Sequence, residues 1–318
     1  GKQVRGLTAY DTNTGEIIGI QAKAVVLATT GHQGIWSSPS DGAGLGSALI
    51  ASASLALTGM GNNPAHPLTV RGTDLNITLD VLGSGGRVRR SSGEDVEPSE
   101  VGDDDCILDL RGLESDAKAW FSNTHTRIKD RTGLDMSREV IPITTSIATT
   151  TGGAPVDEHG RVTFSKGKKW ATGLYAAGRS ANNGMHGEGM LAGNLILDDL
   201  VGGEKAGNHA GTWAKEASFG GSNLVEKVIT NSSKRLESLK SGEGVSVGQA
   251  SATLASVMSS CMNGSRDKSS LKAAADAIAE MKKNGIKVTD QSSVMNTEMC
   301  SALKLQGMIT IAEQITKS

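Results

Sequence analysis

A glycine-rich stretch between two apolar runs, GLYAAGRSANNGMHGEGMLAGNLILD at residues 173–198, places the strongest constraint on how this chain can fold. The apolar run at 174–177 lies between two glycines and has the length of a buried strand. From Met190 onward, apolar residues recur at helical intervals, and Gly202 and Gly203 supply a stop signal. The stretch therefore predicts a strand, a tight turn and a helix.

The predicted turn at 179–189 has a composition that lets the backbone approach a ligand closely. It holds three glycines, two asparagines and a histidine. Its amides can point outward, and the helix that follows presents free N–H groups and the positive end of its dipole. Such a site suits a phosphate or the electron-rich edge of a reduced flavin. Turns of this kind also serve tight packing, so both interpretations stay open at this point.

Composition narrows the classes of function. The 318 residues are enough for two domains, and the net charge of -2 without a basic run excludes nucleic acid as an expected partner. Apolar runs are far shorter than the roughly 18 residues that a membrane-spanning helix needs. The cysteines Cys106, Cys261 and Cys300 have neither a disulfide nor a metal-binding spacing. We therefore expect a cytoplasmic protein without a metal site.

The first 61 residues read as strands followed by a helix. Residues 4–10 and 16–22 alternate around Asn13-Thr14-Gly15, which predicts a hairpin. The apolar run at 24–28 predicts a buried strand, and the turn after it lies where open α/β sheets place ligands. Residues 42–61 predict a helix that faces the sheet with one stripe of side chains. That stripe consists of Leu45, Ala48, Leu49, Ser52 and Leu55.

The middle of the chain, residues 62–138, is richer in polar residues and turns. Residues 83–100 predict an exposed loop region, 107–110 a short strand and 115–131 a helix. We interpret the segment as an inserted, lid-like domain. A long surface excursion is the alternative, although structureless loops of this length are uncommon in compact domains.

The last hundred residues have helical periodicity. A helix is predicted at 270–283, with Ser269 or Ser270 as its cap and Gly285 as its stop. Another is predicted within 294–316, where the methionines are expected to fill the core.

Several segments, in the same order, resemble one known family: the flavoprotein subunit of succinate dehydrogenase and fumarate reductase, which includes L-aspartate oxidase. The resemblance is carried by AVVLATTGHQG (24–34), DGAGLGSALIASA (41–53), HP (66–67), CILDLRGL (106–113), IPITTSIATTTGG (141–153), GLYAAG with HGEGMLAGNLILD (173–198), and VMNTEMCSALKLQGMITIAEQI (294–315). By this resemblance, the family's N-terminal GxGxxG half would precede residue 1 and its RxESRG tail would follow residue 318. Because the chain opens with Gly1, we expect it to be a fragment.

The resemblance implies an α/β fold, α+β overall, in four parts. A partial, Rossmann-like FAD-binding domain would comprise 1–61 and 146–210. A reduced capping or lid domain would occupy 62–145, and a helical domain 211–318.

The resemblance also implies a function in electron transport and the tricarboxylic acid cycle. In this family a dicarboxylate is held between FAD and the lid, and hydride passes between a substrate carbon and flavin N5. The implied partner is the iron–sulfur subunit of a membrane-associated complex, on the cytoplasmic face. Two alternatives remain: a catalytically degenerate scaffold beside such a partner, and an L-aspartate oxidase-like enzyme.

Site residues follow from the matched motifs. His66 and Thr78 fall on the family's substrate-binding histidine and threonine, although a histidine before a proline is also a common structural residue. The expected FAD-binding residues are Ala28, Thr29, Thr30, Gly31, Gly178, Arg179, Gly187, Asn194, Leu195 and Ile196. His186 is expected to contribute a backbone hydrogen bond near the flavin rather than to transfer a proton.

Other positions depart from the family pattern. Charged or catalytic family residues are replaced at Ala43, Ala148, Arg179 and Met190, and the proton-delivering RDxxSRA segment has no counterpart. One lost donor costs roughly 3–4 kcal/mol of transition-state stabilisation, so ordinary succinate or fumarate turnover is in doubt and no catalytic residue is assigned.

Two sets of arginines have alternative interpretations. Arg87, Arg89 and Arg90 either substitute for the missing cations or belong to a solvated turn. Arg179 either meets a flavin phosphate or ribose or is solvated.

Overall fold

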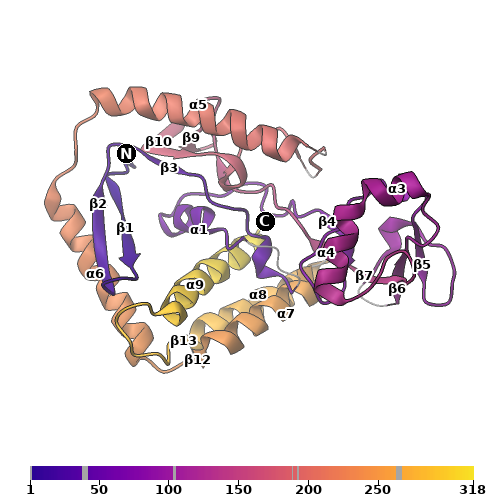
Figure 1. The fold of residues 1–318 in the computed structure, drawn as a ribbon. Coiled ribbons are helices and arrows are strands. Elements are labelled where there is room, and N and C mark those ends of the chain that lie inside the picture. Colours follow the sequence, from indigo (N-terminus) through magenta and orange to yellow (C-terminus); the bar gives the residue numbers. More distant parts are fainter. Residues whose placement is uncertain (1, 38–41, 103–104, 188, 192, 263–266) are drawn as a thin grey trace. The chain divides into compact units, whose positions relative to one another are not determined.

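The computed structural model describes residues 2–37, 42–102, 105–187, 189–191, 193–262 and 267–318 (Figure 1). The chain divides into two compact units. Unit 1 comprises 1–35, 41–63 and 149–318, and unit 2 comprises 36–40 and 64–148. Unit 2 is therefore an insertion into unit 1.

A three-stranded sheet lies at the centre of unit 1. Strand β3 (Val25–Leu27) pairs in parallel with β10 (Lys169–Ala176), and β9 (Arg161–Phe164) pairs with β10 in the antiparallel direction. The predicted strand at 174–177 is confirmed, although β10 starts at Lys169. The side chain of Tyr175 is fully buried, so the apolar run is a core strand as its composition indicated.

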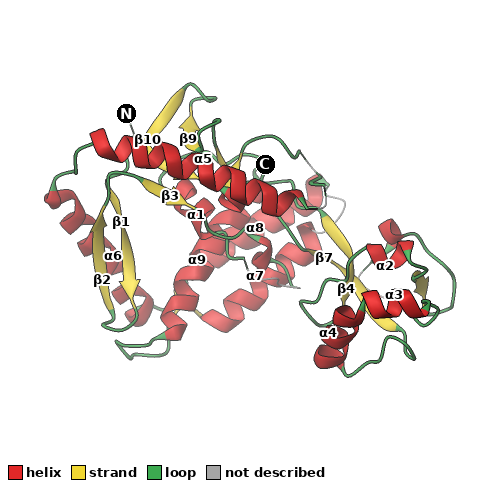
Figure 2. Ribbon diagram, turned by 45° about the horizontal axis from the view of Figure 1, so that its top comes forward, coloured by secondary structure: helices red, strands yellow, loops and turns green. Residues whose placement is uncertain are grey.

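The helix after this sheet, α5 (Asn194–Glu216), differs from its prediction at both ends. It starts at Asn194 rather than Met190, and it runs through Gly202 and Gly203 without a break. A helical glycine costs about 1 kcal/mol, but the burial of Ala206 and Ala210 against β10 outweighs this cost. Helix α5 contacts both β10 and β3 (Figure 2).

The predicted hairpin is confirmed as β1 (Gly6–Asp11) and β2 (Glu16–Gln21), which pair in the antiparallel direction. Helix α6 (Ser222–Ser241) covers one face of it. A side chain at Gly19 would collide with Val225, so the helix lies directly on the strand.

Helix α1 (Leu45–Ser52) is shorter than predicted, and the expected stripe is partly wrong. Leu49 is 58% exposed, whereas Ile50 is buried among the residues of the central sheet. The other side of α1 packs on α9 (Thr297–Thr316), where Gly307 allows the helices to approach closely. A helix enclosed on two sides does not present a single clean apolar stripe.

The remaining helices of unit 1 form a layer made of α7 (Val247–Met262), α8 (Lys268–Asn284) and α9. The predicted stop of α8 at Gly285 is confirmed, but its cap is Asp267, which accepts a 2.7 Å hydrogen bond from the Ser270 amide. The short pairs β12 (Val245–Ser246) with β13 (Ile286–Lys287) and β8 (Ala154–Pro155) with β11 (Ala181–Asn182) complete the unit.

Unit 2 has a four-stranded antiparallel sheet of its own, in the order β4 (Ala65–Val70), β7 (Ile141–Ile147), β6 (Cys106–Asp109) and β5 (Arg87–Arg90). It also contains α2 (Asp80–Gly83), α3 (Ser115–Trp120) and α4 (Ser122–Thr132). Fully buried residues such as Leu108 and Ile128 form its core. The segment is thus not a structureless excursion. The single helix predicted at 115–131 is broken at Phe121, whose side chain is buried.

Candidate functional site

The turns after β3 and β10 are tied together by hydroxyl groups. Ser180, in the 3-10 turn η3 (Gly178–Ser180), donates a 2.9 Å hydrogen bond to the carbonyl of Thr29. The Thr29 hydroxyl lies 2.8 Å from that of Ser180 and accepts a 3.0 Å hydrogen bond from the amide of Gly46. The carboxyl ends of the two parallel strands and the start of α1 are therefore held as one framework.

Residues 28–31 combine an exposed backbone with one tightly enclosed glycine. Ala28, Thr29 and Thr30 are exposed, whereas Gly31 is buried. A Cβ at Gly31 would lie 2.4 Å from the Thr150 hydroxyl and 3.6 Å from the Cβ of Arg179. The structure thus brings the predicted residues Thr29, Gly31, Gly178 and Arg179 together.

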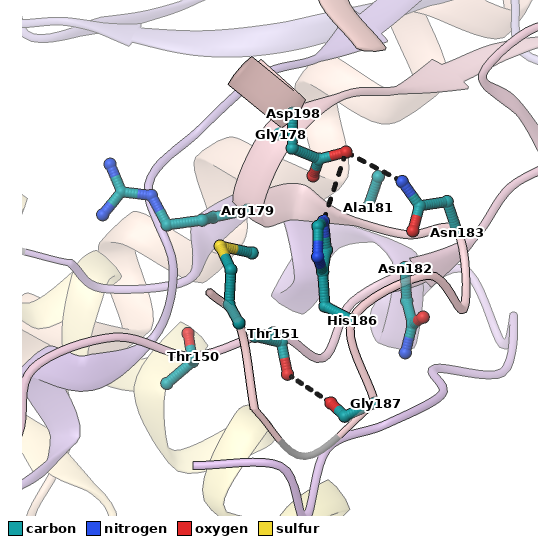
Figure 3. A pocket seen from close by; sticks show the side chains of 11 residues that line it. Thr150, Thr151, Gly178, Arg179, Ala181, Asn182, Asn183, His186, Gly187 and Asp198 are labelled. Atoms are coloured by element: carbon teal, nitrogen blue, oxygen red, sulfur yellow. Dashed lines mark hydrogen bonds and ion pairs between the residues drawn. The ribbon is translucent and has the colours of Figure 1, made fainter. Parts of the chain in front are cut away.

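The glycine-rich turn is anchored at its centre and at its end (Figure 3). Asp198 in α5 accepts a 2.8 Å hydrogen bond from the Asn183 amide and lies 3.6 Å from Nε2 of His186. The carbonyl of Gly187 accepts hydrogen bonds from Asn62 at 2.9 Å and from Thr151 at 3.3 Å. Asn183 therefore holds the turn to the helix through a hydrogen bond, and the His186 ring lies beside the same carboxylate without a hydrogen bond to it. The backbone hydrogen bond expected of His186 near the flavin stays a prediction.

The start of α5 is open. Its N-cap is Gly193, and the described residues supply no side-chain cap to its first turn, although the Asn194 amide donates a 3.1 Å hydrogen bond to the Leu191 carbonyl. A Cβ placed at Gly187, Gly189 or Gly193 would have no atom within 4 Å among the described residues. Because the helix has 23 residues, its first-turn amides and dipole form a positive end that a ligand can approach.

Apolar side chains surround this open helix end. Leu191 is 76% exposed and Ile196 is 67% exposed, and Leu197 also lies at the surface. Exposed apolar side chains near the first turn of a helix suit an isoalloxazine, which has a flat apolar body and an electron-rich edge. The residues at this end of unit 1 therefore fit the flavin portion of FAD.

Two cavities flank the Asp198 anchor. A small pocket is lined by Thr150, Thr151, Arg179, His186, Met190 and their neighbours. A larger cavity of about 520 Å³ reaches along α5 to Lys205. Five residues line both cavities: Gly178, Ala181, Asn183, His186 and Asp198.

His32, immediately after the turn at 29–31, is a buried titratable group that the sequence did not single out. Its Nε2 lies 3.2 Å from the side-chain oxygen of Asn63, and its main-chain amide donates to the hydroxyl of Thr150. Burial lowers the pKa of His32 to about 4, so the imidazole is neutral at pH 7. The run of threonines before Gly152 was the sequence signal that could have identified Thr150 and Thr151 as lining residues.

The two predicted substrate residues lie in unit 2 and are close to one another. The ring of His66 in β4 donates a 2.8 Å hydrogen bond to the carbonyl of Ile77, and Thr78 follows directly. Burial lowers the pKa of His66. The Thr78 hydroxyl donates to Asp80 at 2.9 Å. Both side chains thus have partners within unit 2, and their contact with a substrate remains a prediction.

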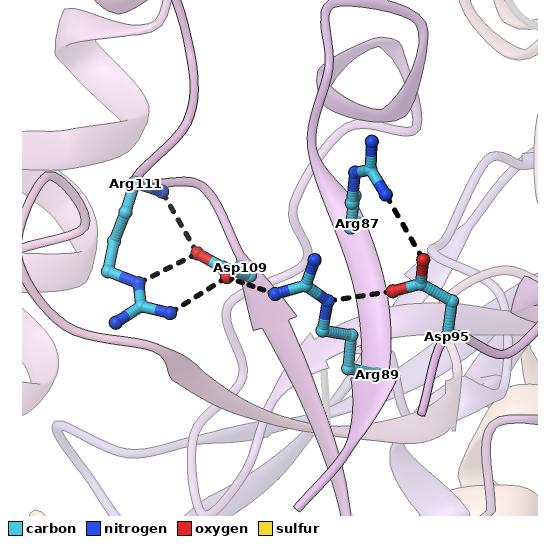
Figure 4. A network of polar contacts seen from close by, with 5 residues as sticks. All are labelled: Arg87, Arg89, Asp95, Asp109 and Arg111. Atoms are coloured by element: carbon cyan, nitrogen blue, oxygen red, sulfur yellow. Dashed lines mark hydrogen bonds and ion pairs between the residues drawn. The ribbon is translucent and has the colours of Figure 1, made fainter. Parts of the chain in front are cut away.

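Two of the three arginines of β5, Arg87 and Arg89, belong to an ion-pair network (Figure 4), whereas Arg90 lies 4.0 Å from Glu94 at the surface. Arg87 and Arg89 both contact Asp95, at 3.1 and 2.7 Å, and Arg89 also contacts Asp109 at 2.9 Å. Arg111 donates to both carboxylate oxygens of Asp109. Hydrogen bonds from Arg89 lower the pKa of Asp95, and those from Arg111 lower the pKa of Asp109.

Among the described residues, no three His, Cys, Asp or Glu side chains are grouped as a metal site. In the same part of the chain, no helix has the length and apolar character to cross a membrane.

The parallel pair β3–β10, followed by a glycine-rich turn and the N-terminus of α5, is an arrangement with which α/β proteins bind nucleotides. Comparison with known proteins makes this specific. A family model described as "FAD binding domain" matches residues 1–196, and one described as "Fumarate reductase flavoprotein C-term" matches residues 251–318. The chain belongs to the FAD-binding family of succinate dehydrogenase and fumarate reductase flavoprotein subunits, and FAD is the cofactor of that family.

Individual relatives agree with this assignment. The chain is 26% identical over 348 residues to a succinate dehydrogenase flavoprotein subunit of Rickettsia bellii, with 96% of this chain and 58% of the relative covered. It is 29% identical over 269 residues to an L-aspartate oxidase of Mycobacterium leprae, with 74% and 49% covered. The chain thus spans about half the length of these relatives.

A solved structure supports the fold. The Escherichia coli quinol fumarate reductase flavoprotein matches with a TM-score of 0.88 at 22% identity, over 99% of this chain and 61% of that one. The expected fold class, a partial FAD-binding domain with further α and β parts, is confirmed.

Proposed function

We propose that the protein is an FAD-dependent oxidoreductase of the succinate dehydrogenase and fumarate reductase type, acting on a dicarboxylate-like substrate. The observation that carries the proposal is the open N-terminus of α5 beside the tied ends of β3 and β10, in a chain of this family. When bound, FAD would supply hydride exchange at N5 with a substrate carbon.

The chain's own residues have separable tasks in this proposal. The first-turn amides of Leu195 and Ile196, with the helix dipole, stabilise negative charge at the edge of the flavin. The exposed backbone at 28–30 and the glycine at 187 allow the cofactor a close approach. Asp198 fixes the turn to the helix through Asn183, so the donors are positioned before the ligand binds.

A dicarboxylate is the substrate class that the relatives' names support, because succinate and fumarate both carry two carboxylates. In unit 2, His66 and Thr78 supply the two side chains proposed to contact it. Their proximity through Ile77 supports a shared role.

Reconstitution tests the proposal directly. The full-length protein, purified with added FAD, is expected to be yellow, to reduce a dye with succinate and to reoxidise with fumarate. A protein that stays colourless after incubation with excess FAD would refute the flavoenzyme proposal.

The second candidate is a scaffold that keeps the flavoprotein fold beside an iron–sulfur subunit without turning over substrate. Two replacements favour it. By the resemblance, Ala148 and Met190 stand at positions where the family has a histidine and an arginine, and neither side chain carries a charge. Under this candidate the flavin-loaded protein exchanges no electrons with succinate, fumarate or L-aspartate, yet it copurifies with an iron–sulfur protein. Oxidation of L-aspartate alone would instead indicate an L-aspartate oxidase-like enzyme. Attachment to the cytoplasmic face of a membrane through such a partner is part of the same proposal.

A further inference from the structure

Three aromatic side chains and a histidine gather where α5 packs on β10, although only 3% of the chain is aromatic. The ring centroids of Trp170 and Trp213 lie 5.0 Å apart, and those of Trp170 and Tyr175 lie 5.6 Å apart. Nδ1 of His209 lies 2.9 Å from the phenol oxygen of Tyr175. These contacts form one continuous row from Trp213 to His209, which we call the aromatic row.

The hydrogen bond between Tyr175 and His209 has a defined direction. Tyr175 is fully buried, and His209 is the one partner of its hydroxyl among the described residues. Burial raises the pKa of Tyr175 to about 12 and lowers the pKa of His209, so both groups are neutral at pH 7. Because a buried phenol needs an acceptor, Tyr175 donates to Nδ1, and the imidazole carries its own proton on Nε2. Nδ1 is therefore positioned to take up the phenol proton.

The two indoles of the aromatic row differ from Tyr175, because neither has a base beside its N–H group. Nε1 of Trp170 donates a 3.0 Å hydrogen bond to the carbonyl of Leu174, which does not take up protons at neutral pH. Nε1 of Trp213 is buried and has no hydrogen-bond partner in the described part of the chain. An indole that loses an electron here keeps its proton, so a neighbouring ring can return the electron to it.

Charges near the aromatic row favour Tyr175 as the place where an oxidising equivalent comes to rest. The guanidinium of Arg161 lies 5.6 Å from the ring centroid of Trp170 and raises the energy of a radical cation there. A proton on His209 is opposed by Arg161 and His159 and favoured by Asp157. The proton is therefore held only while the phenol is oxidised, and it returns when the electron is restored.

We propose that Tyr175 is a redox-active tyrosine that collects oxidising equivalents from Trp170 and Trp213 and passes its proton to His209. A one-electron oxidant such as a peroxyl radical takes an electron from an indole and, with a proton from water, becomes a hydroperoxide. The indole radical cation then takes an electron from Tyr175, whose O–H bond breaks as the proton bonds to Nδ1 of His209. The products are a neutral tyrosyl radical, an imidazolium and the restored indole.

An enclosed tyrosine is a suitable end point for this chemistry. The buried ring cannot couple with a second tyrosine, and an electron from a donor such as ascorbate restores it through the same row. Oxidising equivalents are thereby kept from methionine and cysteine side chains, whose oxidation is harder to reverse. Tyr175 also lies in the strand that leads to the candidate flavin site at Gly178, and reduced flavins react with dioxygen.

Pulse radiolysis of the full-length protein tests the proposal. The azide radical removes one electron from an indole and becomes azide, so the absorption of the indole radical should decay as that of a tyrosyl radical rises. Tyr175→Phe keeps the ring and should remove most of this rise. Tyr10→Phe is the matched control and should not change it, because the Tyr10 hydroxyl donates to the carbonyl of Ser293 rather than to a base.

Two further variants separate the base from the route. His209→Gln keeps an acceptor for the phenol but cannot take up its proton, so the tyrosyl radical should form about 100-fold more slowly. High-field electron paramagnetic resonance should show a positively charged hydrogen-bond donor beside the radical in wild type and not in His209→Gln. Trp170→Phe should lower the tyrosyl yield, whereas Trp120→Phe, at a site that is 81% exposed in unit 2, should not.

Several results would overturn the proposal. Equal tyrosyl yields in wild type and Tyr175→Phe, or equal rates in wild type and His209→Gln, would show that this pair does not react as stated. Equal losses in Trp170→Phe and Trp120→Phe would exclude the aromatic row as the route. The measurements need no turnover of succinate, fumarate or flavin, so these failures are distinct from failure of the proposed function.

Discussion

Two polar regions of this protein use similar side chains with opposite results. In unit 2, the network of Arg87, Arg89 and Arg111 is satisfied by Asp95 and Asp109, which lie between the arginines. In unit 1, Arg179 lacks a carboxylate partner among the described residues, and the first turn of α5 lacks a side-chain cap. The contrast shows that arginines in a sequence indicate a ligand site only where the fold does not pair their guanidinium groups with carboxylates.

The largest expected effect is a loss of stability in unit 2 that leaves ligand binding in unit 1 unchanged. Leu108 is fully buried in the unit 2 core, so Leu108→Ala should lower the free energy of unfolding by about 2–5 kcal/mol. Chemical denaturation measures this loss, and FAD affinity at low temperature should not change. Leu49→Ala, at an exposed site, is the control and should stay within about 0.5 kcal/mol. A loss of FAD binding in Leu108→Ala would contradict the separation of the two roles.

Acid should affect the two regions over different pH ranges. Burial lowers the pKa of His32 to about 4 from 6.5, so the unfolded chain takes up a proton first as the pH falls. At about 1.4 kcal/mol per pH unit, His32 should remove roughly 3 kcal/mol of stability between pH 6.5 and pH 4. Denaturant titrations over this range, on wild type and His32→Asn, measure the difference. Equal pH dependence in the two proteins would contradict the assignment.

Gly31→Ala tests the close approach of the two turns in unit 1. The added Cβ would meet the Thr150 hydroxyl at 2.4 Å, so one turn must shift, at a cost of about 1–3 kcal/mol of stability. FAD affinity should fall about tenfold as well, which flavin fluorescence can follow. Gly112→Ala, in unit 2, has no atom within 4 Å of the new Cβ among the described residues and is the matched control. Similar losses in both variants would remove the special role of Gly31.

Two aspartate variants give the smallest and most direct contrast. Asp109→Asn should cost about 1–3 kcal/mol of stability without changing FAD affinity, because it weakens hydrogen bonds to two guanidinium groups. Asp198→Asn keeps an acceptor for Asn183, so its stability should change by about 1 kcal/mol or less while FAD affinity falls a few fold.

The pH dependence of the Asp109 contribution has a defined sign. Hydrogen bonds from Arg111 lower the pKa of Asp109 in the folded state, so its contribution is present above about pH 4 and is lost below that pH. Acid titration of wild type and Asp109→Asn should therefore converge below about pH 4. Persistent separation of the two curves at lower pH would contradict this account.

Local patterns predicted some elements of the fold well. The hairpin around Asn13-Thr14-Gly15, the buried strand before Gly178 and the stop of α8 at Gly285 each depend on a few neighbouring residues. The extent of α5 could not be predicted, because Gly202 and Gly203 weaken the helix locally while Ala206 and Ala210 stabilise it through contacts with β10.

For the candidate site, too, the sequence predicted some residues and missed others. Order and spacing of motifs indicated the turn at 29–31 and the turn after β10, which the fold brings together. Asn62 and Thr151 were missed because their contact with the carbonyl of Gly187 joins three separate segments. The pairing of Arg89 with Asp95 and Asp109 likewise depends on strand register, which residue spacing alone does not fix.

The bridge at the base of the insertion has a consequence for how this protein can vary. Thr58 and Gly153 exchange two backbone hydrogen bonds, at 2.9 and 3.0 Å, just before the chain leaves unit 1 and just after it returns. This antiparallel bridge holds together the two chain segments that connect unit 1 to unit 2. Residues 64–148, which belong to unit 2, can therefore be lengthened, shortened or exchanged during evolution while this pair of hydrogen bonds keeps the two connecting segments in register.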